Sequence, residues 1–353
     1  MEIRTIRTEE RPAVGALLDA WRLAEGWTAG DRFRRQIEFD PRYADENVFV
    51  AVAAGEIIST LMIFPRRLRI LGHSVPTGGI GNAWTASGHR RQGVGTKLVE
   101  SACDAMRSRG LELALTFASD PSAARDSSAA RGWYHWAGQR TILRRNPSDS
   151  ARRSSDSDYV ELESVGRDNK RALESVKPIH TAYGASRSGT IDRDDELWQA
   201  CLELTPAPHE EFWLARRGGL TVAYARASII DDVLTITELG RFEDGADALA
   251  RLIGSLLDER DDDPLSGDEL SSAELRSFVV LPTFDDIGLS VALESRGIRS
   301  HPMDDPGAKL RCVNLIGFAA RLDVDLLPME DGPKFLERIL PPDAMVFWPS
   351  DRF

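Results

Sequence analysis

Apolar residues in the first half of the chain follow two periods, one typical of β-strands and one typical of α-helices. A period of about 3.6 residues predicts helices at 11–25 and 93–110, and a short helix is expected before residue 134. In the helix at 93–110, Val94, Leu98 and Ala102 share the apolar face, and Gly110 is placed to end the helix. Strands are predicted at 1–6, 47–55, 57–65, 78–86, 111–119 and 134–145, the last of which is expected to close the unit.

The second half repeats this order of elements. Helices are predicted at 168–183, 194–204, 244–259 and 287–297. Strands are predicted at 159–165, 211–219, 220–229, 234–240, 276–284 and 309–319. The matching order, at little sequence identity, favours an internal duplication.

A polar segment separates the two halves. Residues 146–158, NPSDSARRSSDSD, are rich in serine and aspartate and nearly free of apolar side chains, which is typical of a linker. The predicted organisation is a first domain at 1–147, a linker at 148–157, a second domain at 158–325 and a C-terminal helix and tail at 326–353.

Composition narrows the class of protein without defining its function. The chain has 353 residues, of which 42% are hydrophobic, as expected for a globular protein with a core. The chain contains no apolar run long enough for a transmembrane helix, and its charged N-terminus is unlike a signal peptide, so we expect a cytoplasmic protein. Cys103, Cys201 and Cys312 are far apart in the sequence, which excludes a disulfide framework or a zinc cluster.

The charge is distributed unevenly. The net charge is −12, which disfavours nucleic acid as a partner, and it divides into +4 for residues 1–150 and −16 for residues 151–353. The more positive first half suits an anionic cofactor, and the acidic second half suggests a cationic amine acceptor. Adaptation to a high-salt cytoplasm would also produce such an acidic surface, so both interpretations stay open.

The segment Arg90-Arg91-Gln92-Gly93-Val94-Gly95-Thr96 lies between a predicted strand and a predicted helix. Two glycines let the backbone curl with its N–H groups directed inward, and the helix adds its own free N–H groups and the positive end of its dipole. Such a loop can bind a pyrophosphate, and Arg90 and Arg91 can add positive charge at its rim.

Other nucleotide motifs fit this segment less well. A Walker A loop requires lysine where Val94 stands, and a dinucleotide-binding loop requires a third glycine where Leu98 stands. The remaining alternative is that Gly93 and Gly95 only make a tight turn between strand and helix.

The segment resembles the acyl-CoA loop of the GNAT acetyltransferase superfamily, whose pattern is Q/R-x-x-G-x-G/A. Arg90, Gly93 and Gly95 match this pattern directly, and the order of elements over residues 1–145 is similar to the fold of that family. The tandem arrangement is similar to the enhanced-intracellular-survival family without its sterol-carrier-like domain, since residues 326–353 are too few for a third domain. The resemblance implies an α/β (α+β) fold of two tandem GNAT-like domains, each a mixed, mostly antiparallel sheet flanked by helices.

The resemblance also implies where acetyl-CoA would bind. The pantetheine arm would pair with the backbone of Ala83, Trp84 and Thr85, and Ser119 would lie beside the thioester. The pyrophosphate would be held near Arg90 and Arg91 by the amides of Gln92, Gly93, Val94, Gly95 and Thr96. The large side chain of Trp84 is either a wall of the acceptor pocket or a packing residue. The second half has Glu243 and Asp244 at the equivalent junction, so it is expected to bind no cofactor.

Three residues are candidates for catalysis. The family commonly has a tyrosine that protonates the leaving thiolate, but Ser128 stands in that place here and is a poorer acid, although it could position a water. Tyr134 lies just beyond this place and is a second candidate, with packing as the alternative role. In the enhanced-intracellular-survival family the terminal carboxylate acts as the base, which would be that of Phe353 here. The alternative for this tail is docking as a plug.

The sequence therefore predicts direct transfer of an acetyl group from acetyl-CoA to an amine of a small molecule or peptide. No metal, nucleic acid or membrane is expected to take part, and homo-oligomerisation is left open. The alternatives are a catalytically idle CoA-binding sensor or scaffold, and an enzyme that transfers another acyl or aminoacyl group.

Overall fold

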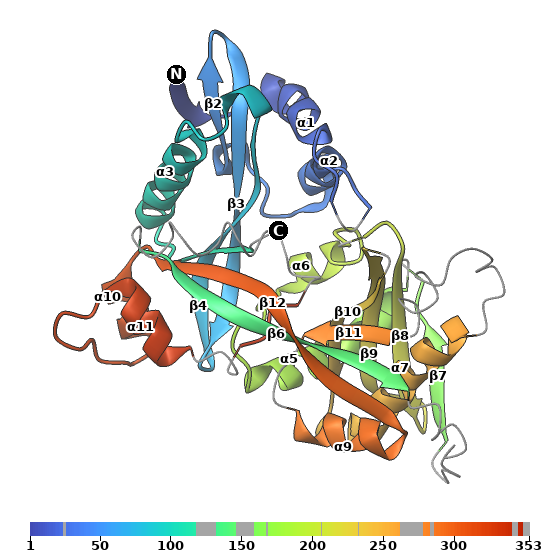
Figure 1. The fold of residues 1–353 in the computed structure, drawn as a ribbon. Helices are drawn as coiled ribbons and strands as arrows, with labels where there is room; N and C mark the ends of the chain where they lie inside the picture. The colour runs from blue at the N-terminus through green and yellow to red at the C-terminus, as the bar shows by residue number, and fades with distance from the viewer. Residues whose placement is uncertain are drawn as a thin grey trace.

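A computed structural model describes residues 1–23, 26–117, 132–145, 159–166, 169–205, 207–231, 233–261, 278–282, 286–340 and 345–348. The predicted linker at 148–157 and the short helix expected before residue 134 lie outside the described residues. Figure 1 shows two lobes joined by the long strands β6 and β12, and a smaller helical lobe formed by α10 and α11.

The first half contains most of the predicted elements. It comprises β1 (Glu2–Thr5), α1 (Arg11–Asp19), α2 (Ala29–Phe39), β2 (Val48–Ala53), β3 (Glu56–Ile70), β4 (His73–Thr85), α3 (Val94–Ser108), β5 (Leu113–Phe117) and β6 (Tyr134–Arg145). Helix α1 ends earlier than the predicted 11–25, and α2 has no counterpart among the predicted helices. Phe33 and Ile37 are the large apolar residues of α2 that pack on the core, so the helix offers few apolar positions from which it could be predicted. The pair Thr28 and Asp31 could have indicated the start of this helix from the sequence, because it forms a capping box. The Thr28 side chain accepts a hydrogen bond from the Asp31 N–H at 2.9 Å.

The second half repeats the pattern. It comprises β7 (Val160–Ser164), α5 (Lys170–Ala185), α6 (Asp195–Ala200), β8 (Glu210–Arg217), β9 (Leu220–Ile230), β10 (Val233–Arg241), α7 (Ala246–Asp261), β11 (Phe278–Pro282), α9 (Ile287–Ser295), β12 (Ile298–Cys312), α10 (Leu315–Arg321) and α11 (Gly332–Ile339). The strand predicted at 309–319 is wrong in its bounds. The chain leaves β12 at Cys312, and Asn314 caps α10 by accepting from the Gly317 N–H at 3.1 Å.

The twelve strands of the described residues form one continuous sheet in the order β1-β2-β3-β4-β5-β12-β6-β11-β10-β9-β8-β7. The fold is therefore α+β, with two seven-stranded mixed sheets that share β6 and β12. The pairs β4–β5 and β10–β11 are parallel and the other pairs are antiparallel.

The position of β6 corrects one expectation from the sequence. Strand β6 does not pair with β5 to close the first unit. Instead β12 of the second half pairs with β5, for example Leu310 opposite Leu115, while β6 pairs with β11 and β12. Each half thus supplies its last strand to the middle of the joint sheet. There the backbone N–H and C=O groups on both edges of β6 and of β12 can form hydrogen bonds to a neighbouring strand.

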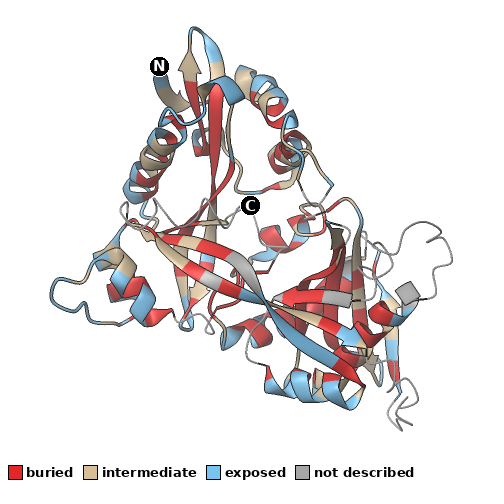
Figure 2. Ribbon diagram, viewed as in Figure 1, coloured by how far each residue is buried: buried red, intermediate tan, exposed pale blue. Residues whose placement is uncertain are grey.

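The sheet of the first half is covered on both faces. The side chains of β3 alternate, so that Leu61 and Ile63 pack under α3 while Met62 and Phe64 pack under α1 and α2. Figure 1 shows α3 on one side of β2 and β3 and the helices α1 and α2 on the other. The buried residues in Figure 2 follow these inner faces.

The segment Met345–Trp348 returns to the junction of the two halves. The Val346 N–H donates to the Ser188 carbonyl at 2.9 Å, and Phe347 packs edge-on against Phe117 of β5 and Trp136 of β6. Among the described residues, no helix has the length and apolar character that crossing a membrane requires.

Candidate acyl-CoA site

Strands β4 and β5 separate before they end, and no strand of the described residues lies beside the last part of β4 on that side. Their pairing covers Thr77–Gly79 opposite Leu113–Leu115, and the Thr116 hydroxyl still donates to the Ile80 carbonyl at 3.1 Å. Beyond Ile80, β4 continues to Thr85 and pairs with β3 alone among the strands that the structure describes. An extended ligand could add to this edge through backbone hydrogen bonds, as a further strand would.

A β-bulge lies on this part of β4. The register with β3 passes from Met62 opposite Gly81 to Thr60 opposite Trp84, so that Asn82 and Ala83 together face Leu61. Asn82 has a φ of +49° and is buried, whereas Ala83 is exposed. The bulge turns the backbone at the start of the Ala83–Thr85 segment, where the sequence predicted contacts with pantetheine.

The loop after β4 ends at the N-terminus of α3. Arg91 and Gly93 have φ values of +58° and +77°, and this alternation of left-handed residues directs successive N–H groups to one side. Gly93 is the N-cap and has no side chain that could accept from the first turn. Side chains cap six other helices, at Thr28, Asn169, Asp194, Asp286, Asn314 and Asp331. The N-terminus of α3 therefore presents amides and a positive dipole end to a ligand.

The side chains around the loop are exposed and mostly basic. Arg90 lies over the ring of Trp84 at 4.3 Å and donates from Nε to the Thr85 carbonyl at 2.9 Å. Trp84 stacks on Trp21 of the segment after α1, with centroids 5.2 Å apart. Trp84 is therefore half-buried on the face of the sheet that α1 and α2 cover, and it packs against Arg90 at the rim of the loop.

The other predicted site residues fall into two groups. Tyr134 is half-buried on β6, and its hydroxyl donates to the Leu340 carbonyl at 3.1 Å, so this group contacts the C-terminal region. Burial raises the pKa of the Tyr134 hydroxyl. Ser119, Ser128 and Phe353 lie outside the described residues.

The corresponding junction in the second half has a different chemistry. Glu243 and Asp244 precede α7, and Asp247 in its first turn pairs with Arg217 at 2.7 Å. A Cβ on Gly245 would lie 2.4 Å from the Val222 carbonyl oxygen, so the backbone is packed closely here. Carboxylates in these positions would repel a diphosphate.

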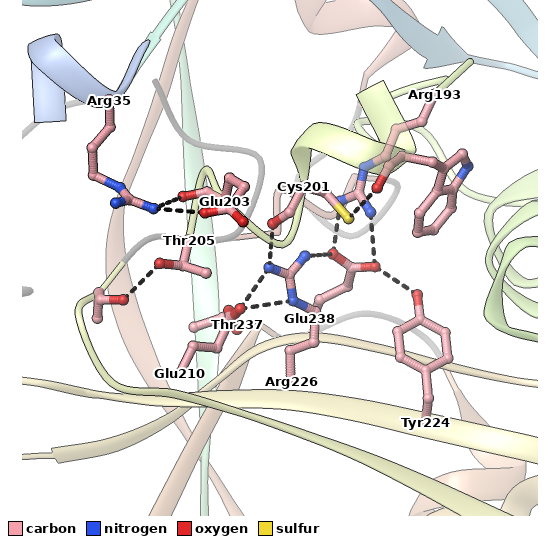
Figure 3. Close-up of polar contacts among 12 residues, drawn as sticks. Arg35, Arg193, Cys201, Glu203, Thr205, Glu210, Tyr224, Arg226, Thr237 and Glu238 are labelled. Atoms are coloured by element: carbon pink, nitrogen blue, oxygen red, sulfur yellow. Dashed lines mark hydrogen bonds and ion pairs between the residues drawn. The ribbon is translucent and has the colours of Figure 1, made fainter. Parts of the chain in front are cut away.

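A buried ion network lies in the second half, close to the first (Figure 3). Glu238 of β10 is fully buried and accepts from Arg193 at 2.7 Å, from Arg226 at 3.3 Å and from the Tyr224 hydroxyl at 2.7 Å. Burial opposes ionisation of this carboxyl, but the two guanidinium groups hold the pKa of Glu238 well below its usual range. The sequence offered no signal for this network, because its members come from separate segments of the chain.

The part of the chain that the structure describes contains no group of three or more His, Cys, Asp or Glu side chains able to hold a metal ion. The three cysteines are free, and burial raises the pKa of the Cys103 thiol to about 11 and that of Cys312 to about 12. These two thiols are therefore protonated near neutral pH and are poor nucleophiles.

Comparison with known proteins agrees with this geometry. Residues 2–128 match the family model of the acetyltransferase (GNAT) domain. A search of curated protein sequences found no match. Residues 2–128 are therefore similar to a GNAT acetyltransferase domain, and the chain as a whole shares the fold of solved N-acetyltransferase structures.

Three solved structures illustrate the likeness. A GCN5-related N-acetyltransferase from Kribbella flavida is 18% identical, with a TM-score of 0.61 over 91% of this chain and 73% of that chain. Eis1 from Mycobacterium abscessus is 18% identical, with a TM-score of 0.57 over 89% of this chain and 74% of that chain. N-myristoyltransferase from Saccharomyces cerevisiae, solved with bound myristoyl-CoA, is 10% identical, with a TM-score of 0.54 over 88% of this chain and 78% of that chain. At these identities the likeness concerns the fold.

Proposed function

We propose that the protein is an N-acetyltransferase that transfers the acetyl group of acetyl-CoA directly to an amine. The observation that carries this proposal is the unpaired edge of β4 leading to the uncapped N-terminus of α3 at Gly93. The edge suits the extended pantetheine arm, and the N-terminus suits the pyrophosphate. The yeast N-myristoyltransferase, which shares the fold, was solved with an acyl-CoA bound.

The reaction then follows from this placement. The backbone of Ala83–Thr85 polarises the thioester carbonyl, the amine lone pair forms a bond to the carbonyl carbon, and the C–S bond breaks with its electron pair going to sulfur. The ammonium first loses one proton to a base. After the attack the nitrogen loses a second proton as the C–S bond breaks, and the departing thiolate takes up one proton, so that one proton is released overall. The products are the acetylated amine and free CoA.

We assign the base to the terminal carboxylate of Phe353. The support is the docking of Met345–Trp348 between the two halves, where Phe347 packs against Phe117 at a centroid distance of 5.5 Å. Phe117 ends β5 and so lies at the open side of the β4 edge. Tyr134 and Ser128 remain the candidates for protonating the thiolate, Tyr134 only after release of its bond to Leu340.

The experiment measures acetyl-CoA affinity by calorimetry and CoA thiol release over a panel of amines. Gly93→Glu places a carboxylate against the pyrophosphate, and we expect it to weaken acetyl-CoA binding at least 10-fold. Gly110→Glu is the matched control, because Gly110 lies at the other end of α3 with a φ of +76° against +77° for Gly93. A Cβ atom added at either glycine would have no neighbouring atom within 4 Å, so both substitutions have open space around them.

Equal affinities of the two variants would refute the binding site. Tight acetyl-CoA binding without thiol release on any amine would instead favour the CoA-binding sensor.

A further inference from the structure

A pocket lies between the two halves on the α2 side of the first sheet. It has a volume of about 70 Å³ and is lined by Trp27, Arg35, Gln36 and Arg66 of the first half and by Arg193 and Leu204 of the second, among other residues. A wider groove of about 340 Å³ adjoins it and shares Arg66 and Arg193 with it. Figure 3 shows Arg35 approaching Glu203 across this junction, with Arg193 and Glu238 beside it.

This pocket is connected to the acyl-CoA site by one hydrogen bond. Gln36 lines the pocket, and its Oε1 accepts from Nδ2 of Asn82 at 2.6 Å. Asn82 belongs to the β-bulge and directly precedes Ala83, the first residue of the segment proposed to bind the thioester. The pocket therefore lies on the face of the sheet opposite α3, with Gln36 and Asn82 between it and Ala83.

Two donors in the pocket wall have no acceptor. Trp27 Nε1 and Arg35 Nε are buried, and neither bonds to any described residue. The two side chains are in contact, since the Arg35 guanidinium lies over the Trp27 ring at 5.2 Å from its centroid. Arg35 donates from Nη2 to the Glu203 carbonyl, which fixes its direction. Buried donors without an acceptor are costly, so this wall is suited to a ligand that brings oxygen atoms.

The charged side chains that line the pocket indicate whether such a ligand is an anion or a cation. Four arginines and one carboxylate, Asp40, line the pocket. Asp40 is already engaged by Arg66 at 2.6 Å, and Arg193 is held in place by Glu238 at 2.7 Å. Arg35 also forms an ion pair with the Glu203 carboxylate, at 3.4 Å through Nη2, which leaves its Nε without an acceptor. An ammonium group would meet mainly guanidinium groups here, whereas a carboxylate would meet partners of opposite charge.

We propose that this pocket binds a carboxylate of the acceptor, so that the substrates are small amines that carry a carboxylate, such as amino acids. The inference rests on the proposed acetyltransferase function and replaces the expectation of a cationic acceptor. The size agrees, because about 70 Å³ is several times the roughly 10–15 Å³ that one water molecule requires, so the pocket has room for a carboxylate group. The wall of Trp27, Phe64 and Leu204 accommodates the apolar part of such a molecule.

The first test compares matched acceptors in the presence of acetyl-CoA. L-phenylalanine and L-leucine are assayed beside their carboxamides and beside spermidine, with free CoA as the readout. We expect the KM of the amino acids to be at least 10-fold lower than that of the amides. Equal or better use of the amides or of spermidine would overturn the proposal.

The second test uses variants of the pocket wall. Trp27→Phe keeps an aromatic ring under Arg35 and removes the orphaned N–H, so a structural role predicts no change in the KM of the acceptor. We expect this variant to raise the KM of the preferred amino acid roughly 10-fold while the KM for acetyl-CoA and kcat stay unchanged. Arg34→Gln is the control, because Arg34 lies on the same helix with a half-exposed side chain paired to Asp19 and Asp31.

The readouts separate this inference from the proposed function. Failure to bind acetyl-CoA would refute the function, and calorimetric titration with L-phenylalanine alone would still test the pocket. Binding that Trp27→Phe weakens and Arg34→Gln leaves intact supports the proposal. No binding of L-phenylalanine, or equal binding by both variants, overturns it.

Discussion

His180 is a buried titratable residue outside the proposed acyl-CoA site. Its ring lies edge-on to Trp198 at a centroid distance of 4.9 Å, and its Nε2 has no acceptor among the described residues. Burial lowers the pKa of His180 to about 3, and the nearby Arg193 and Arg69 act in the same direction against Glu238 and Asp192. The folded protein therefore keeps this imidazole neutral, whereas the unfolded chain can protonate it.

The stability of the fold depends on pH through His180. Between pH 6.5 and about 3 the unfolded state binds one proton at this imidazole that the folded state does not bind, so the free energy of unfolding falls as the pH is lowered through this range. At pH 5 the loss amounts to about 2 kcal/mol. We expect His180→Phe to remove this part of the slope between pH 7 and pH 5 in urea titrations. His73→Gln, at the exposed start of β4, is the control. An unchanged slope in His180→Phe would contradict the assignment.

At the scale of elements, the termini of helices and strands define the proposed acyl-CoA site. Helix α3 begins at a glycine, whereas six other described helices begin at a capping side chain, and β4 extends beyond its pairing with β5. The C-terminal segment is a third such element. It is short, yet Val346 and Trp348 are each 1% exposed, so it is firmly packed before the chain reaches residue 349.

Deleting Asp351–Phe353 tests the role of this segment. The deletion leaves the packed Met345–Trp348 in place and removes the native carboxylate, so we expect kcat to fall by about 100-fold or more while acetyl-CoA affinity is retained. A steady-state assay and calorimetry measure the two quantities. Full activity of the shortened chain would remove the carboxylate from the mechanism and leave docking as the role of the tail.

At the scale of the whole molecule, the exchange of β6 and β12 links the two halves. Each half would have an unpaired strand edge without the other, and unpaired edges expose backbone donors and acceptors. The exchange also brings Arg193 of the second half beside Arg66 of the first, which creates the pocket between them. The second half thus lines the proposed acceptor pocket even though its own loop carries acidic residues.

We expect the two halves to unfold in one cooperative transition. Leu310 of β12 is fully buried between β5 and β6, and Leu310→Ala should lower the free energy of unfolding by about 2–5 kcal/mol while far-UV circular dichroism and tryptophan fluorescence still report the same midpoint. Leu220→Ala, at a position that is 73% exposed, should change it by less than about 0.5 kcal/mol. Two separate transitions would show that the halves are independent.

Much of the proposed acyl-CoA site could be predicted from the sequence, because it is local. Gly93, Gly95 and the amphipathic helix after them are neighbours along the chain, and their conformations follow from backbone sterics and periodicity. The pocket could not be predicted in this way. Trp27, Gln36 and Arg193 are distant in the sequence, and arginine on a polar helix such as α2 is usually a solvated residue.

The sequence by itself determined the type and order of most elements, the glycine turn before α3 and the acidic residues at the matching junction of the second half. Only the tertiary structure decided that β12 lies beside β5, that the pocket between the halves is lined by arginines and that the buried carboxylate of Glu238 holds one of them. The physical reason is that period-two alternation specifies which face of a strand is buried, whereas its backbone hydrogen bonds are the same for any neighbouring strand. The choice of neighbour depends on the packing of the complete chain.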